Sequence, residues 1–265
     1  MHSSFQLARK FIGYYFNAKN SKGHGIHSPF VFDFVKNVLN DKRSYPCYSK
    51  IEEKRKQLLN DNTVIAVEDF GAGSAVIPFK TRKVKAIAAS SLKHKKFAQL
   101  LYRIAKYYQP KNIVELGTSF GISTSYLASA SSATTVYTME GAASIASIAQ
   151  QTFDKLDLNN VELLRGSFDK ILPALFEQLE YINLLFVDGN HRRDATLKYF
   201  YEALKKSKPS SIFIFDDIHW SIEMEEAWQE IKSHPSVSLT IDLFFIGIVF
   251  FSRDFKVKQD FAIRF

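Results

Sequence analysis

A short glycine-containing segment is the first part of the sequence that could do chemistry. Lys111–Thr124 reads KNIVELGTSFGIST, with an acid at Glu115 and glycines at Gly117 and Gly121. Its apolar start is typical of a buried strand, the first glycine allows a tight turn, and the following residues have helix-compatible spacing. A strand, a glycine turn and a helix start leave unpaired N–H groups beside a positive dipole end. Such a pocket suits a nucleotide or the carboxylate of a ligand.

A second acid, Glu140, indicates which ligand this pocket would take. It follows the apolar segment VYTM, 23 residues after Gly117, which is the distance expected for a ribose-binding carboxylate in a βαβ nucleotide unit. The loop is E-x-G-x-x-x-G rather than G-x-G-x-x-G, and this argues against a dinucleotide and a hydride-transferring enzyme. The alternative is an ordinary βαβ crossover with incidental glycines.

Two further apolar segments end in carboxylates. Ile182–Val187 precedes Asp188, and Ile212–Phe215 precedes Asp216 and Asp217. Parallel strands lie about 4.8 Å apart and present their carboxyl ends at one edge, so these acids converge if their strands are neighbours. A divalent cation would relieve their repulsion, and all-oxygen ligands favour Mg²⁺, Ca²⁺ or Mn²⁺ over zinc. The alternative is that the aspartates cap helices and order loops.

The first two motifs resemble those of class I S-adenosylmethionine (AdoMet) methyltransferases. In that family the glycine motif has this acidic-x-Gly-x-x-x-Gly form, and an acid after the second strand holds the ribose. The loop after the third strand lies against the adenine, and here it reads RGSF, with Ser167 where many members carry an acid. The resemblance implies AdoMet as the cofactor. The residues it implies for the cofactor site are Glu115, Gly117, Thr118, Ser119, Gly121, Ser123, Glu140, Gly141, Ser167, Phe168 and Asp188.

The segments FVDGNH and FDD resemble, more narrowly, the metal-dependent O-methyltransferases of the catechol and caffeoyl-CoA type. This resemblance covers residues 90–250, while the N-terminal part is similar to an uncharacterised bacterial methyltransferase group. It implies that Asp188, Asp216 and Asp217 hold a divalent cation, which in the family binds two vicinal substrate oxygens. A lysine often follows the first of these acids as a base, but Gly-Asn-His stands there instead.

Methyl transfer from a sulfonium needs a nucleophile held in line about 3 Å away and stripped of its proton. His191 and His219 are the expected proton acceptors, and with Asp188 they form the expected catalytic set, because imidazole titrates near neutral pH and a cation lowers the pKa of a hydroxyl. The expected function is O-methylation of a small-molecule hydroxyl, assisted by a divalent cation. The alternatives are a metal-independent methyltransferase acting on RNA ribose, lipid, sugar or protein, and a catalytically silent binding module.

The elements that must position these residues form an α/β pattern. Helical periodicity occurs in residues 90–108 and between the strand-like segments. We expect a Rossmann-like, seven-stranded methyltransferase sheet that ends in a C-terminal antiparallel hairpin. Residues 89–265 would form the methyltransferase domain, and residues 1–88 a helical extension or lid with a loop preceding the core. The apolar segments of strand length are residues 112–116, 136–139, 161–164, 182–187, 212–215, 237–243 and 246–251.

Two N-terminal motifs compete with these assignments. Thr63–Ser74, TVIAVEDFGAGS, also combines apolar residues, an acid and glycines, but no acid occurs between Asp69 and Glu115 to hold a ribose. We therefore expect a loop there. The segment GHGIHSPF contains His24 and His27, which could bind a metal or substrate or simply order a loop.

Composition narrows the class of partner. The chain has 265 residues, 46 % of them apolar, enough for one substantial core. Its formal charge of +8 is compatible with nucleic acid, an anionic membrane or an acidic substrate without choosing among them, and the alternative is an ordinary solvated basic surface. The Phe- and Tyr-rich residues 5–16 could dock on a membrane or a partner. Methylation of nucleic-acid bases is not expected, because the Asn/Asp-Pro-Pro-aromatic sequence of those families is absent after Val187. A small-molecule substrate is expected, and a homodimer is compatible with the sequence.

Cysteine usage and hydropathy indicate the compartment. Cys47 is the single cysteine, so one chain can form neither a disulfide nor a thiolate zinc site. The N-terminus lacks the apolar region of a signal peptide, and the longest apolar run, Leu243–Phe251, is too short to span a bilayer. We therefore expect a cytoplasmic protein without a transmembrane segment.

Overall fold

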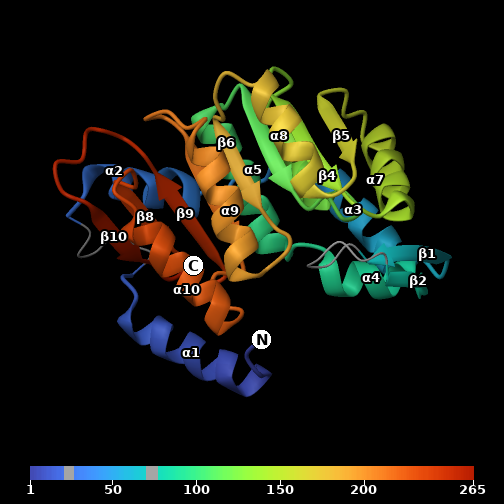
Figure 1. The fold of residues 1–265 in the computed structure, drawn as a ribbon, viewed down its shortest axis with the longest axis horizontal. Coiled ribbons are helices and arrows are strands. Elements are labelled where there is room, and N and C mark those ends of the chain that lie inside the picture. Colours follow the sequence, from blue (N-terminus) through green and yellow to red (C-terminus); the bar gives the residue numbers. More distant parts are fainter. Residues whose placement is uncertain (21–26, 70–76) are drawn as a thin grey trace. The chain divides into compact units, whose positions relative to one another are not determined.

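The structure is a computed structural model that describes residues 1–20, 27–69 and 77–265. His24 and the glycines of the two N-terminal motifs lie outside the described residues. The chain forms two compact units, drawn in Figure 1: the first unit contains Met1–Asp41 and Leu179–Phe265, and the second unit contains Lys42–Gln178. The expected division into residues 1–88 and 89–265 stays a prediction about domain organisation.

The second unit is built around three parallel strands. β3 pairs with β4 and β4 with β5, so the carboxyl ends of these strands lie at one edge. α7 packs on β4 and β5, α8 contacts β4, and α5 packs against α6. The elements of this unit are α3 (Pro46–Asn60), β1 (Val64–Asp69), β2 (Ile77–Lys83), α4 (Val84–Ser91), α5 (Lys95–Tyr108), β3 (Asn112–Leu116), α6 (Ile122–Ala128), β4 (Thr135–Glu140), α7 (Ala143–Lys155), β5 (Val161–Arg165) and α8 (Phe168–Gln178).

Two local expectations for this unit are wrong. Much of Thr63–Ser74 is not a loop: β1 pairs antiparallel with β2 in a separate two-stranded sheet. Its β-branched residues favour a strand once a partner strand is present. The expected helix 90–108 is interrupted, because α4 ends at Ser91 and α5 begins at Lys95 after His94, whose Nδ1 accepts the N–H of Lys96 at 3.3 Å.

The first unit contains a mixed sheet in the order β10-β8-β9-β7-β6. β6 is parallel to β7, whereas β9 is antiparallel to β7 and to β8. The expected C-terminal antiparallel hairpin is therefore confirmed. All residues of β6, β7 and β9 are buried, which agrees with their continuous apolar sequences. The elements are α1 (Ser4–Asn17), α2 (Pro29–Phe34), the π-helix η1 (Val35–Leu39), β6 (Leu184–Val187), α9 (Arg193–Leu204), β7 (Ile212–Asp216), α10 (Ile222–Ser233), β8 (Leu239–Asp242), β9 (Ile246–Phe250) and β10 (Gln259–Ala262).

The α/β class is confirmed, but the strand count is corrected. Among the described residues, the three parallel strands of the second unit and the five sheet strands of the first make eight rather than seven, and the additional strand is β10. It pairs in parallel with β8, and Thr240 Oγ1 donates to Asp260 Oδ1 at 2.7 Å. Its four residues, QDFA, are partly exposed and lack an apolar run, so the pairing is determined by the neighbouring strand. No helix within the described ranges has the length and apolarity required to cross a bilayer.

Candidate functional site

The loop between β3 and α6 has the backbone conformation that its glycines predict. Gly117, Ser119 and Gly121 have positive φ angles of 104°, 47° and 80°, a region in which only glycine is unstrained. The N–H of Gly117 donates to Met139 O at 3.2 Å, which holds the loop against the end of β4. A Cβ atom at Gly121 would lie 2.5 Å from the ring of Phe153. Close packing thus adds to the requirement for glycine at this position.

Glu140 lies beside this loop. Its Oε2 accepts the N–H of Ser119 and its Oε1 accepts the N–H of Ala142, each at 3.0 Å. Burial raises the pKa of Glu140, and the backbone donors of Ala142, Ser119 and Gly141 oppose that rise. A carboxylate offers about four acceptor positions, so these three backbone donors do not fill it and capacity remains for a hydrogen bond from a ligand. The structure therefore brings the acid expected for ribose next to the glycine loop.

Glu115 is completely buried at the base of the same loop. Its Oε2 accepts hydrogen bonds from the hydroxyls of Thr124 and, at 2.6 Å, Thr138. Thr138 is also 2.6 Å from the hydroxyl of Thr118. Glu115 thus joins β3, β4 and α6, and its contact with a cofactor stays a prediction. Sequence reasoning missed Thr124 and Thr138; a hydroxyl within the apolar segment VYTM was the available signal for the latter.

The other expected cofactor residues of this unit lie in or near the loops that follow β3, β4 and β5. Ser123 is buried in the first turn of α6, while Gly141 follows Glu140 directly. The N–H of Gly166 donates to Glu140 O at 3.0 Å, so the third loop is also held at this edge. Ser167 follows that glycine and Phe168 begins α8. Asp188 lies in the first unit, and its contribution to the cofactor site stays a prediction.

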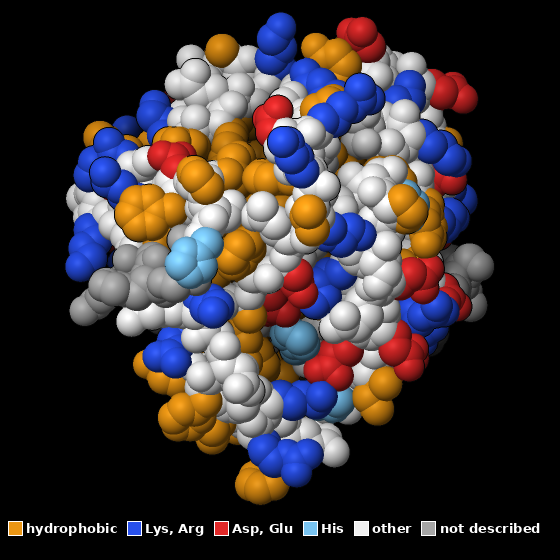
Figure 2. Space-filling view, turned by 90° about the vertical axis from the view of Figure 1, so that its left-hand side faces the viewer, with side chains coloured by type: hydrophobic (Ala, Val, Ile, Leu, Met, Phe, Trp, Pro, Cys, Tyr) orange, Lys and Arg blue, Asp and Glu red, His pale blue; other side chains and the backbone are white. Residues whose placement is uncertain are grey.

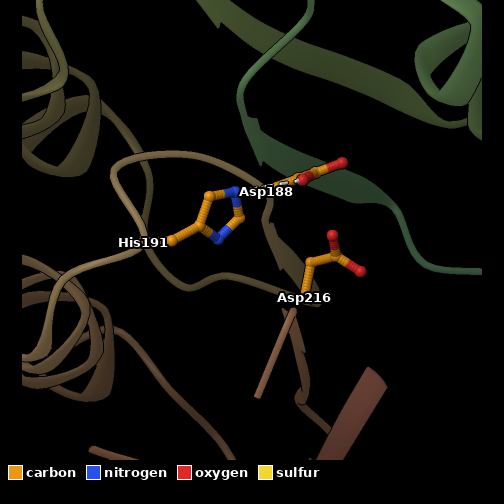
Figure 3. Close-up of side chains that lie close together, drawn as sticks. All are labelled: Asp188, His191 and Asp216. Atoms are coloured by element: carbon orange, nitrogen blue, oxygen red, sulfur yellow. Dashed lines mark ion pairs between the residues drawn. The ribbon is translucent and has the colours of Figure 1, made fainter. Parts of the chain in front are cut away.

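The first unit brings together Asp188, His191 and Asp216 (Figure 3), and one potential ligand atom from each lies within 4.8 Å of the others. Asp188 follows β6 and Asp216 ends β7, and these strands pair with Val187 opposite Phe215, which explains the convergence of the two acids. His191 Nε2 is 3.7 Å from Asp188 Oδ1. The loop after β6 therefore adds an imidazole to the pair of carboxylates.

This acidic cluster, Asp188, His191 and Asp216, has a donor set that fits a divalent cation. Asp216 is buried, whereas Asp188 and His191 are partly exposed, so a ligand can reach the cluster. Carboxylates suit Mg²⁺, Ca²⁺ and Mn²⁺, and an imidazole shifts the preference toward a transition metal such as Mn²⁺. Without a cation, the carboxylate of Asp188 still lies beside the imidazole of His191.

Asp217 is not a member of this cluster. Its φ angle is 54°, and its N–H donates to Phe245 O at 2.7 Å. The left-handed conformation turns the chain directly after Asp216, so adjacent acids in the sequence take different positions. A metal-ligating role of Asp217 stays a prediction, and the geometry favours His191 as the third member.

His219 is likewise engaged elsewhere. Its Nε2 lies 2.9 Å from Asp242 Oδ2 and its Nδ1 3.2 Å from Glu225 Oε1. Burial opposes the charged form, but the hydrogen bonds and charges of Asp242 and Glu225 outweigh it and raise the pKa of His219. Because both ring nitrogens have carboxylate partners, the geometry supports a structural imidazolium more than a free base.

An open pocket of about 560 Å³ lies beside His219 in the first unit. Its volume falls in the range of small-molecule sites. Arg193, one of its lining residues, is held by Glu230 at 2.6 Å, and five of the six lining residues carry polar side chains. Figure 2 shows acidic and histidine side chains next to one another on the face that it draws. The lining residues are Arg193, His219, Ile222, Glu225, Glu226 and Gln229.

Sequence comparison identifies a related domain in the chain. Residues 114–218 match a family model described as a methyltransferase domain. A catechol O-methyltransferase of Niastella koreensis is 33% identical over 126 residues, which cover 46% of this chain and 55% of that protein. The chain thus matches about half the length of this curated relative.

Structural comparison shows the fold over a longer part of the chain. An SAH-bound methyltransferase of Podospora anserina, PaMTH1, is 12% identical with a TM-score of 0.59, and the match covers 85% of this chain and 97% of that one. An O-methyltransferase of Bacillus cereus in complex with SAH is 21% identical with a TM-score of 0.55, and the match covers 83% of this chain and 97% of that one. The SAM-bound O-methyltransferase TomG of Streptomyces achromogenes is 18% identical with a TM-score of 0.56, and the match covers 79% of this chain and 91% of that one. The resemblance to O-methyltransferases that the motifs indicated is confirmed.

Proposed function

We propose that this chain, with its methyltransferase domain at residues 114–218, is an AdoMet-dependent O-methyltransferase that acts on a small-molecule hydroxyl. The observation that carries the cofactor assignment is the position of Glu140, whose carboxylate lies 3.0 Å from the N–H of Ser119 in the glycine loop. Ribose hydroxyls are donors, and Glu140 retains acceptor positions for them. The glycine loop and the carboxylate expected to bind the ribose therefore lie next to each other.

The second unit would hold the cofactor through three loops. Glu140 would accept hydrogen bonds from the ribose hydroxyls. Because its side chain is already fixed in position, less side-chain entropy is lost when the cofactor binds. Ser167 and Phe168, which follow β5, would contact the adenine through a hydroxyl and a ring. AdoMet, when bound, supplies a methyl group on a sulfonium, and the sulfur needs little assistance as the leaving group.

The acidic cluster of the first unit would prepare the acceptor hydroxyl. Asp188 and Asp216 would hold a divalent cation, with His191 as a third ligand, and the cation would favour the deprotonated acceptor. We include acceptors with two vicinal oxygens because two oxygens can chelate one cation. Catechol, for which the relative of Niastella koreensis is named, is the simplest such acceptor.

A metal-independent mechanism is the second candidate, and the distance of 3.7 Å between His191 Nε2 and Asp188 Oδ1 favours it. In that mechanism Asp188 orients the imidazole and stabilises its charge, and His191 takes the proton from the acceptor. In this alternative the acceptor needs no second, vicinal oxygen, because no cation is chelated and His191 alone removes the proton.

A methyl-transfer assay tests the proposal and separates the two mechanisms. The protein is incubated with AdoMet and either catechol or its 1,3-isomer resorcinol, in Mn²⁺, Mg²⁺, Ca²⁺ or EDTA, and products are followed by mass spectrometry. We expect methylation of catechol that requires a cation and is lost in Asp216→Asn. Equal activity in EDTA would support the metal-independent mechanism. AdoMet binding without transfer to phenol, sugar or lipid acceptors would indicate a silent binding module.

A further inference from the structure

The N-terminal helix α1 has two apolar faces, and within the described part of the chain only one of them packs on the protein. Phe11 contacts Phe244 with ring centroids 5.1 Å apart, and the ring of Tyr14 lies 5.3 Å from the same phenylalanine. Lys10 Nζ forms an ion pair of 2.9 Å with Glu225. Figure 1 shows α1 beside α10, the helix that carries Glu225. Residues 7, 10, 11 and 14 thus form the inner face of α1.

The helix is fixed at both ends, so its orientation within the first unit is defined. Ser3 caps its N-terminus in a capping box with Gln6, and the N–H of His2 donates to Trp220 O at 3.0 Å. After the helix, the N–H of Lys19 donates to Ala262 O at 2.7 Å. The outer face is therefore held away from the protein rather than free to turn inward.

The outer face of α1 exposes large apolar side chains. Phe5, Ile12 and Phe16 are 80%, 56% and 75% exposed, and a helical spacing of 100° per residue places them within one narrow stripe. Tyr15 is also exposed, and its ring lies 6.3 Å from that of Phe16. Together these side chains form an unpaired apolar stripe on a 14-residue helix, which is a typical feature of a docking surface.

The charges that residues 1–32 and Arg264 bring to the stripe are positive. The first acidic residue of the chain is Asp33, so residues 1–32 contain arginine and lysine but no carboxylate side chain. Arg9 is exposed and lies one turn from Phe5. The guanidinium of Arg264 lies 4.6 Å from the centre of the Tyr15 ring, and it brings another cation to this helix. An apolar stripe with basic borders matches an anionic lipid surface, in which acyl chains take the rings and headgroups pair with the cations.

A second copy of the chain fits this surface less well. Arg9 lies near the middle of α1, so two antiparallel copies of the stripe would place the two Arg9 side chains together at the centre of the contact. No carboxylate among residues 1–32 is present to pair with them. We propose that the outer face of α1 docks the protein on an anionic membrane surface, with Phe5, Ile12 and Phe16 inserted between the headgroups.

Vesicle co-flotation tests this proposal with the full chain. We expect binding to vesicles of phosphatidylcholine mixed with phosphatidylglycerol, and at least about tenfold weaker binding of the double variant Phe5→Ser/Phe16→Ser, because two apolar side chains lose their burial. Arg9→Gln should weaken binding and reduce its sensitivity to salt. Val257→Ser is the matched control, since Val257 is 74% exposed in the same unit but outside α1, and it should bind as the unchanged chain does.

Three outcomes would overturn the proposal. One is equal binding to vesicles of phosphatidylcholine alone, and another is unchanged binding of the double variant. The third is sedimentation equilibrium that shows a dimer dissociated by the double variant, without vesicle binding; this would assign the stripe to a second copy. Circular dichroism should show the same helix content for all variants, because the substituted side chains are exposed.

Discussion

Glu140 Oε2 accepts the N–H of Ser119 at 3.0 Å, which fastens the acid at the end of β4 to the glycine loop after β3. The same carboxylate accepts the N–H of Ala142 at 3.0 Å, so both its oxygens have fixed positions. A ligand hydroxyl that binds here therefore meets a carboxylate that is already held in one orientation before the ligand arrives.

The first prediction concerns AdoMet affinity. Glu140→Gln removes the charge and one acceptor oxygen while keeping the shape of the side chain. Loss of one hydrogen bond to a charged group, about 1.5–3 kcal/mol, corresponds to affinity weaker by about 10- to 150-fold. Isothermal titration with AdoMet measures the change. Glu162→Gln on the neighbouring strand β5 is exposed and should bind normally; equal affinity in both variants would remove Glu140 from the ribose role.

The second prediction concerns the conformation of the glycine loop. Gly121→Ala forces a side chain into the left-handed region at φ 80° and places its Cβ 2.5 Å from Phe153. Strain and overpacking should lower the free energy of unfolding by about 2–4 kcal/mol, measured by urea denaturation. In Gly13→Ala the added Cβ meets no atom within 4 Å, and the higher helix propensity should stabilise by about 0.5–1 kcal/mol. Equal effects at the two sites would contradict the steric account.

The third prediction concerns cation binding. Asp188→Asn and Asp216→Asn should each abolish a rise in Tm induced by Mn²⁺, because each removes a charged oxygen ligand from the acidic cluster. Asp217→Asn should retain the rise, since the backbone of Asp217 turns away toward Phe245. Differential scanning fluorimetry with Mn²⁺, Mg²⁺ and Ca²⁺ provides the measurement. If only Asp217→Asn lost the rise in Tm induced by the cation, Asp217 would be a ligand and the acidic cluster would not hold the cation.

The fourth prediction concerns the pH dependence of stability. The partners of His219 raise its pKa above 6.5 in the folded state, so its stabilisation is complete below pH 6.5 and is lost as the pH rises through the folded pKa. Unfolding free energies measured across this range should therefore show a decline above pH 6.5 that is reduced in His219→Gln.

His234 supplies a control of opposite sign. Burial lowers its pKa below 6.5, so it destabilises the folded state below pH 6.5, and this penalty disappears as the pH rises. His234→Gln should keep the decline that is attributed to His219. A decline that persists unchanged in His219→Gln would show that other groups cause it.

Local sequence patterns predicted much of the second unit. The spacing from Gly117 to Glu140 predicted their proximity, because a short parallel βαβ unit has few ways to connect neighbouring strands. In the first unit, the apolar runs before Asp188 and Asp216 predicted two buried strands, and the pairing of β6 with β7 supplied the condition under which their acids converge. Such features depend on periodicity and spacing, which the sequence contains directly.

Features that depend on distant partners could not be predicted in this way. β10 is a strand because β8 pairs with it, and β1 is a strand because β2 does. The residues of β10, QDFA, have no apolar run of their own, so their state is decided by the hydrogen bonds of the neighbouring strand, whereas β1 has strand-favouring residues whose partner the sequence did not identify.

The sequence by itself determined the chemical inventory and the α/β class, because residue types and periodicity are local properties. Only the tertiary structure decided which groups meet: His191 joins Asp188 and Asp216, whereas His219 is held by Glu225 and Asp242. The physical reason is that a side chain takes the partners that satisfy its hydrogen bonds and charge within the folded chain. Those partners, like Asp242 for His219, lie on other elements, at distances along the chain that no local pattern encodes.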